Sequence, residues 1–133
     1  MKRLLPVAVA SWMAGFGAYV AALAIFWGQS LSRGDLGTVL MVSAVASAVA
    51  VALVYAPVMF AIRRRFASGP SWIFPVVSTL LGIVPVALIV RYWGGDLRAL
   101  TSPEAALFFC MFAAFGIVFG IGFYLTHVKE PRA

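Results

Sequence analysis

Charge is scarce in this sequence, and so are the residue types on which most metal and cofactor sites depend. Only 11% of the 133 residues are charged and 64% are hydrophobic, which leaves too little polar surface for a soluble globule. Cys110 and His127 are the only residues of their types. A lone cysteine excludes an intrachain disulfide, and this pair cannot build a zinc or haem site alone. We therefore expect no cofactor and no metal.

Acidic residues are also few, and they avoid the long apolar runs. The four are Asp35, Asp96, Glu104 and Glu130, all at or beyond the ends of these runs. Ionisable groups inside a membrane usually mark proton relays or ion pathways, and none lies at mid-depth here. No serine has a general base available for nucleophilic chemistry. The sequence thus predicts no catalytic residue and a protein that is not an enzyme.

Long uncharged stretches are what the sequence does contain. Four of them exceed the roughly 20 residues that cross about 30 Å of hydrocarbon. Amides within hydrocarbon must be satisfied inside the chain and strand-like alternation is absent, so each stretch is predicted to be helical. The predicted fold class is all-α, an integral membrane four-helix bundle of two helical hairpins that forms one domain over residues 1–133. Its helices are expected at about 5–28, 36–62, 71–93 and 103–127.

Basic residues are unevenly distributed between the two sides of such a bundle. Seven fall with the termini and the loop after the second helix, and three fall on the other side. The first group is Lys2, Arg3, Arg63, Arg64, Arg65, Lys129 and Arg132, and the second is Arg33, Arg91 and Arg98. Because cytoplasmic loops carry excess Lys and Arg, both termini are predicted to be cytoplasmic.

The expected partners follow from where these charges lie. The net charge of +6 is confined to the gaps between apolar runs, where it orients helices and contacts anionic lipid. We therefore expect membrane lipids and other transmembrane helices as partners, and no nucleic acid. The short loops and alanine-rich composition favour a prokaryotic inner membrane.

Small residues mark the candidate helix-packing positions. In the second helix, Ser43 and Ser47 lie one turn apart among alanines, so we expect this helix to lie inside the bundle. In the fourth helix, Gly116 and Gly120 form a GxxxG pattern, which permits close contact within the bundle or between subunits.

Prolines predict irregularities in two helices. Pro57 removes an amide from the second helix and frees the carbonyl of Leu53, which allows a bend. Pro75 and Pro85, with Gly82 between them, make some irregularity plausible in the third helix. The fourth helix has a clear start, because Ser102 and Pro103 provide a hydroxyl cap and a first-turn proline.

Phenylalanines form one stripe along the fourth helix. They recur at steps of four and three, at Phe108, Phe112, Phe115, Phe119 and Phe123. Such a stripe can face lipid, pack in the core, or line a groove for an acyl chain or a partner helix, and the sequence leaves these alternatives open.

These features favour a non-catalytic membrane protein. The first hypothesis is an accessory or scaffolding subunit whose helices associate with itself or with a larger membrane complex. The alternative is a small oligomeric transporter or channel for an ion or small solute, in which backbone carbonyls and hydroxyls line the path.

Overall fold

The computed structural model describes residues 3–29, 32–66, 69–94 and 96–129, and most of them are helical. The elements are α1 (Leu4–Trp27), α2 (Arg33–Ala50), the π-helix η1 (Val51–Tyr55), α3 (Ala56–Arg65), α4 (Ile73–Gly94), the short 3₁₀-helix η2 (Leu97–Thr101), α5 (Pro103–Phe123) and the π-helix η3 (Tyr124–Val128). The predicted all-α fold is confirmed. Four stretches are long and apolar enough to span a membrane: Leu4–Trp27, Gly34–Arg65, Ile73–Trp93 and Pro103–Val128.

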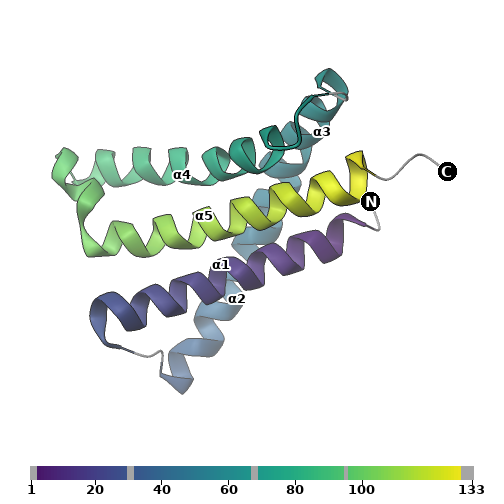
Figure 1. The fold of residues 1–133 in the computed structure, drawn as a ribbon. Helices are drawn as coiled ribbons and strands as arrows, with labels where there is room; N and C mark the ends of the chain where they lie inside the picture. The colour runs from purple at the N-terminus through teal and green to yellow at the C-terminus, as the bar shows by residue number, and fades with distance from the viewer. Residues whose placement is uncertain (1–2, 30–31, 67–68, 95, 130–133) are drawn as a thin grey trace.

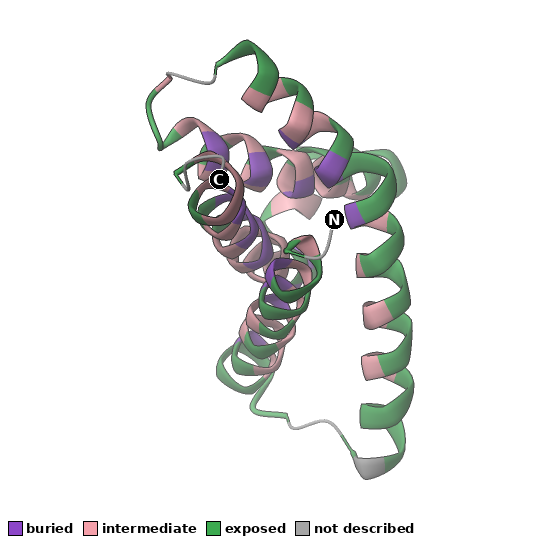
Figure 2. Ribbon diagram, turned by 90° about the vertical axis from the view of Figure 1, so that its right-hand side faces the viewer, coloured by how far each residue is buried: buried purple, intermediate pink, exposed green. Residues whose placement is uncertain are grey.

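Helix α5 is the centre of the bundle. It packs along α1 on one side and along α4 on the other, and these three helices lie side by side in Figure 1. The continuous stretch of α2, η1 and α3 crosses behind them at a steep angle (Figure 1). In Figure 2, α2 stands apart from α1 and α5 over much of its length. Helices α4 and α5 thus form a packed hairpin, whereas α1 packs mainly on α5 and touches its sequence neighbour α2 far less.

Close approach of α1 to α5 depends on glycine in both helices. A Cβ atom at Gly15 would lie 3.0 Å from the carbonyl oxygen of Met111, and one at Gly122 would lie 2.8 Å from Val7 Cγ1. Helix α2 has no comparable contact: none of its residues 34–50 is buried. The expectation that the second helix lies inside the bundle is therefore wrong for residues 34–50, whereas Val51, Tyr55, Ala56 and Met59 further along the same stretch are buried.

The core lies where α3, α4 and α5 meet. Met59, Phe74, Phe119 and Phe123 have no exposed surface. The rings of Phe119 and Phe123 stack with their centroids 6.4 Å apart, and Phe74 stacks on Phe123 at 6.1 Å. Offset and edge-to-face aromatic pairs of this kind stabilise a core beyond simple burial.

The phenylalanine stripe of α5 has two different environments. Phe115, Phe119 and Phe123 are buried in the core, whereas Phe108 is 45% exposed. Phe112, between them, lines a pocket. The environment changes because η1 and α3 cover only the Phe115–Phe123 end of the stripe, where Tyr55 packs on Phe115 and Phe119, and Phe60 packs on Phe123.

Pro57 coincides with a change in helix geometry. The π-helix η1 immediately precedes α3, and the amide of Ala56 bonds to the carbonyl of Val51, one residue further back than in an α-helix. A π-turn accommodates the missing amide and the steric demand of a proline ring. Pro85, by contrast, lies inside an α4 that is helical from Ile73 to Gly94. The departure from α-helical geometry therefore occurs at η1, in the second long helical stretch, and not in α4, where Pro85 was expected to cause one.

Serine side chains cap two of the helices. Ser102 accepts a hydrogen bond from the amide of Ala105 at 3.1 Å, with Pro103 in the first turn, as the sequence predicts. Ser32 accepts a bond from the amide of Asp35, also at 3.1 Å. This cap lets α2 begin at Arg33, before the predicted start at 36, and the stretch continues to Arg65, past the predicted end at 62.

Candidate functional site

Two of the predicted packing residues, Gly116 and Gly120, face α4. A Cβ atom at Gly116 would lie 2.5 Å from Thr79 Cα, and one at Gly120 would overlap Pro75 Cα. Both neighbours are backbone atoms, which cannot move aside as a flexible side chain would. The GxxxG face is therefore occupied by α4 within the chain.

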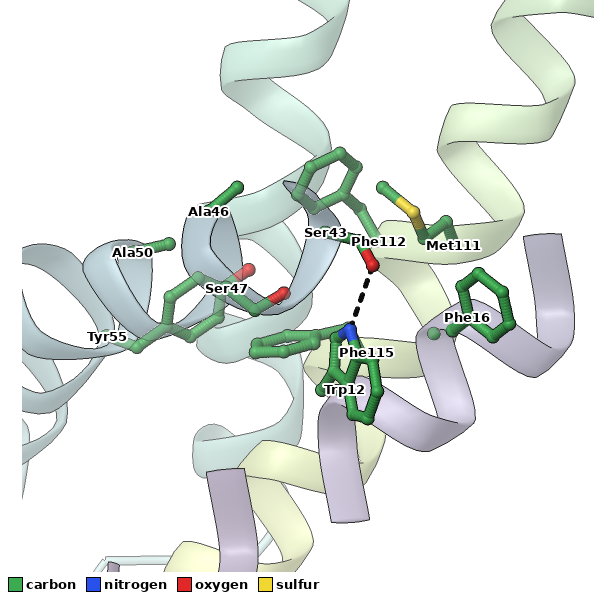
Figure 3. Close-up of a pocket in the computed structure, with 11 residues that line it drawn as sticks. Trp12, Phe16, Ser43, Ala46, Ser47, Ala50, Tyr55, Met111, Phe112 and Phe115 are labelled. Carbon is green, nitrogen blue, oxygen red and sulfur yellow. Dashed lines mark hydrogen bonds between the residues drawn. The ribbon is translucent and has the colours of Figure 1, made fainter. Parts of the chain in front are cut away.

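The other two, Ser43 and Ser47, face a different space. The indole nitrogen of Trp12 on α1 donates a hydrogen bond of 3.0 Å to Ser43 Oγ on α2 (Figure 3). Ser43 Oγ in turn donates to the carbonyl of Leu40 at 3.1 Å. The four predicted positions thus do not form one surface, because the glycines face α4 and the serines face α1 and α5.

The space beside these serines is a mainly apolar pocket bounded by α1, α2, η1 and α5 (Figure 3). It encloses about 130 Å³. Its lining comes from α1 (Trp12, Gly15, Phe16), from α2 (Ser43, Ala46, Ser47, Ala50), from η1 (Tyr55) and from α5 (Met111, Phe112, Phe115). The pocket exists because α2 diverges from the other helices and presents only small side chains to them.

Tyr55 contributes the most unusual polar group of this pocket. The residue is 2% exposed, and its hydroxyl has no hydrogen-bond partner among the described residues. The ring packs against Phe115 and Phe119, with centroid distances of 5.1 and 5.3 Å. A Cβ atom at Gly82 would lie 2.7 Å from the Tyr55 hydroxyl oxygen. The absence of a side chain at Gly82 therefore makes room for this hydroxyl.

Ser78 of α4 is a second buried polar residue. Its side chain has no exposed surface, and Oγ has no partner within the described ranges. Neighbouring Thr79 is satisfied, because its hydroxyl donates to the carbonyl of Pro75 at 2.7 Å. Buried hydroxyls without partners are uncommon in proteins, so Ser78 and Tyr55 are the candidate polar positions of the interior.

Trp12 is a pocket residue that the sequence did not single out, whereas Phe112 belongs to the phenylalanine stripe expected for the fourth helix. Helix periodicity places Trp12 on α1 correctly, but nothing in the local pattern says which helix it meets. Tyr55 had one usable signal, since it lies two residues before Pro57, where helix geometry was expected to change.

His127 lies in η3 against aromatic rings. It stacks on Phe123 with centroids 4.8 Å apart and meets Phe60 edge to face at 5.6 Å. Its Nδ1 lies 2.6 Å from Thr126 Oγ1, and the Thr126 hydroxyl donates its hydrogen to the carbonyl of Gly122 at 2.7 Å. Among the described residues, no group of three or more His, Cys, Asp or Glu could hold a metal ion.

The described residues form an all-helical bundle with four stretches long and apolar enough to span a membrane. The stretch that begins with α2 packs only loosely against α1. Comparison of the chain with protein-family models, curated proteins and solved structures finds no match.

Proposed function

We propose that the chain is an integral protein of a prokaryotic inner membrane with both termini in the cytoplasm. The length and apolarity of its four long helical stretches support insertion. Large apolar side chains exposed on different helices, such as Leu5, Leu53, Leu88 and Ile117, agree with contact to lipid. The bias of seven basic residues against three supports the orientation, although Lys2 and Arg132 lie outside the described residues.

Cysteine labelling tests this orientation without altering a charge. With Cys110→Ser as the background, we expect Thr101→Cys to react with a membrane-impermeant maleimide on intact cells. Phe66→Cys should react only in inverted membrane vesicles, because it follows the three arginines at 63–65. Both positions are exposed at helix ends. The reverse pattern would invert the proposed orientation, and labelling of both from one side would contradict a four-span arrangement.

We further propose that the protein is a non-catalytic accessory or scaffolding subunit, which associates through α2 with a second copy or with a larger membrane complex. The observation that carries this proposal is that residues 34–50 of α2 include no buried position. The outward side of α2 exposes Met41, Val45 and Val49 at steps of four. A helix so poorly covered by its own chain has an apolar face available to another helix.

Native mass measurement after gentle extraction tests association. We expect a second copy or foreign subunits to remain attached. In the Cys110→Ser background, Val45→Cys should form intermolecular cross-links if the partner is another copy. Leu88→Cys, on the exposed side of α4, is the matched control and should not. A single chain without companions and without the Val45 cross-link would contradict the proposal.

A small transporter or channel is the second candidate. It is favoured by the π-helix η1, which places the unpartnered hydroxyl of Tyr55 in the interior near Gly82. π-turns are frequent at functional sites, and interior hydroxyls can replace solvation of a solute. Flux of ions and small metabolites into proteoliposomes tests it, and movement no faster than in empty vesicles would exclude it.

A further inference from the structure

A groove lies between α4 and α5 at the end of this hairpin that is away from the core. Near the core, Gly116 and Gly120 let the two backbones touch. Towards η2, α5 carries Phe108 and Phe112 instead of glycine, and the two helices leave a groove of about 570 Å³ between them. Small-molecule sites in proteins usually measure roughly 300–1,000 Å³, so this groove is large enough for a ligand.

Glu104 is the one charged side chain among the residues that line this groove. Within the described part of the chain, its carboxylate makes no hydrogen bond and no ion pair. Helix capping does not need it, because Ser102 Oγ already accepts a bond from the amide of Ala105 at 3.1 Å. The amide of Ser102, which a capping carboxylate would otherwise bond, donates to the carbonyl of Ala99 at 3.3 Å. The carboxylate of Glu104 is therefore available to a ligand.

Charge around the groove favours a positively charged ligand. Glu104 lies in the first turn of α5, at the partially positive end of the helix dipole, where a negative charge is favourable. Arg91 and Arg98 lie at the same end of the hairpin, but neither lines the groove and neither pairs with Glu104. The groove therefore has one negative side chain and, among its described lining residues, no positive one to balance it.

The walls of the groove favour a cation with an apolar body. Trp93 of α4 and Phe108 and Phe112 of α5 line it, and the faces of such rings attract cations. Because Phe112 follows Glu104 by eight residues on one helix, the groove extends about 12 Å from the carboxylate towards the middle of the span. An exposed tryptophan at a membrane surface is ordinary. Its combination with an unpaired carboxylate above an apolar groove is what identifies the ligand.

We propose that this groove binds a lipophilic organic cation, with a substituted ammonium group between Glu104 and Trp93 and an apolar tail along Phe108 and Phe112. A phospholipid with an ammonium headgroup fits less well, because its phosphate would find no lysine or arginine in the lining. The inference rests on the proposed insertion and orientation, which place the groove at the outer surface of the membrane. It does not depend on association through α2, which contributes no residue to this groove.

Trp93 fluorescence tests the proposal with octyltrimethylammonium as the probe. Trp27→Phe and Trp72→Phe remove the other two exposed tryptophans, and Trp12 is kept throughout. With the protein in a neutral maltoside detergent, the probe should shift the Trp93 emission to shorter wavelength and the shift should saturate. A protein that retains Trp27 in place of Trp93 is the matched control, because Trp27 is exposed at the end of α1 and does not line the groove.

Two carboxylate variants separate the site from general surface charge. Glu104→Gln removes the negative charge and should weaken probe binding about fivefold. Asp96→Asn removes a charge from the neighbouring loop and should bind the probe unchanged, because Asp96 does not line the groove. Octanesulfonate, which has the same tail and the opposite charge, should not compete with the probe.

Two apolar variants test the wall independently of charge. Phe108→Ala removes a ring from the groove and should weaken probe binding about threefold. Ile117→Ala is its matched control, because Ile117 is also an exposed apolar residue of α5 but lies outside the groove. Circular dichroism should show that both variants remain helical.

Four results would overturn the proposal. An equal shift of Trp27 would mean that the probe merely enters the detergent, and unchanged affinity of Glu104→Gln would remove the proposed ion pair. Effective competition by octanesulfonate would identify a site for hydrocarbon alone. Displacement of the probe by phosphatidylethanolamine would identify a lipid headgroup as the occupant. A monomeric protein that still binds the probe would contradict only the proposed association, and cysteine labelling reports on insertion separately.

Discussion

Gly120→Ala is expected to lower the free energy of unfolding by about 2–3 kcal/mol, because the added methyl group has no space. Its Cβ atom would overlap the Cα atom of Pro75 and approach the carbonyl oxygen of Phe74 at 2.6 Å. Relief requires the backbones of α4 and α5 to separate, which weakens packing along their shared length. Unfolding by sodium dodecyl sulfate in mixed micelles, followed by circular dichroism, measures the loss.

Gly17→Ala in α1 is the matched control for this substitution. A Cβ atom at Gly17 would have no neighbour within 4 Å. Replacement of a helical glycine by alanine reduces the conformational freedom of the unfolded chain, so stability should be unchanged or rise by about 0.5 kcal/mol. If Gly120→Ala were as stable as Gly17→Ala, the described contact between α4 and α5 would be wrong.

Phe119→Ala is expected to cost about 3 kcal/mol, through the cavity that it leaves in the core. The side chain has no exposed surface, and its ring contacts Phe115, Phe123 and Tyr55 with centroid distances of 6.0, 6.4 and 5.3 Å. Within a membrane this cost comes from lost packing contacts, since lipid tails are as apolar as the core. The same detergent titration measures it.

Phe108→Ala tests the same chemical change at the exposed end of the stripe. Phe108 is 45% exposed, so truncation removes few contacts and should alter stability by less than about 0.5 kcal/mol. Equal losses at Phe108 and Phe119 would mean that both ends of α5 are covered alike, which would contradict the position of η1 and α3.

The phenylalanine stripe shows where prediction from sequence stops. Its spacing places five rings on one face of a helix, but lipid, core and groove are all apolar and favour the same residue type. Coverage by other helices decides the environment, and coverage depends on crossing angles that no local pattern contains. The core position of Phe119 and the exposure of Phe108 could only come from the assembled bundle.

The small residues of the second helix illustrate a different limit. Serine and alanine permit close helix contact, and this led to the expectation of an interior helix. In the structure the same face borders a pocket, with a hydrogen bond from Trp12 to Ser43 across it. Small side chains allow close approach without requiring it, because they contribute little contact surface of their own.

The sequence by itself determined the helical class, the four long apolar stretches and the Ser102 start of the last helix, because these depend on hydropathy and on groups a few residues apart. Tertiary structure alone decided that α5 is central, that Gly116 and Gly120 meet α4, and that Tyr55 joins Trp12 around a pocket. Those pairings depend on residues far apart in the chain and on how closely two backbones can approach, and this geometry exists only once the helices have packed.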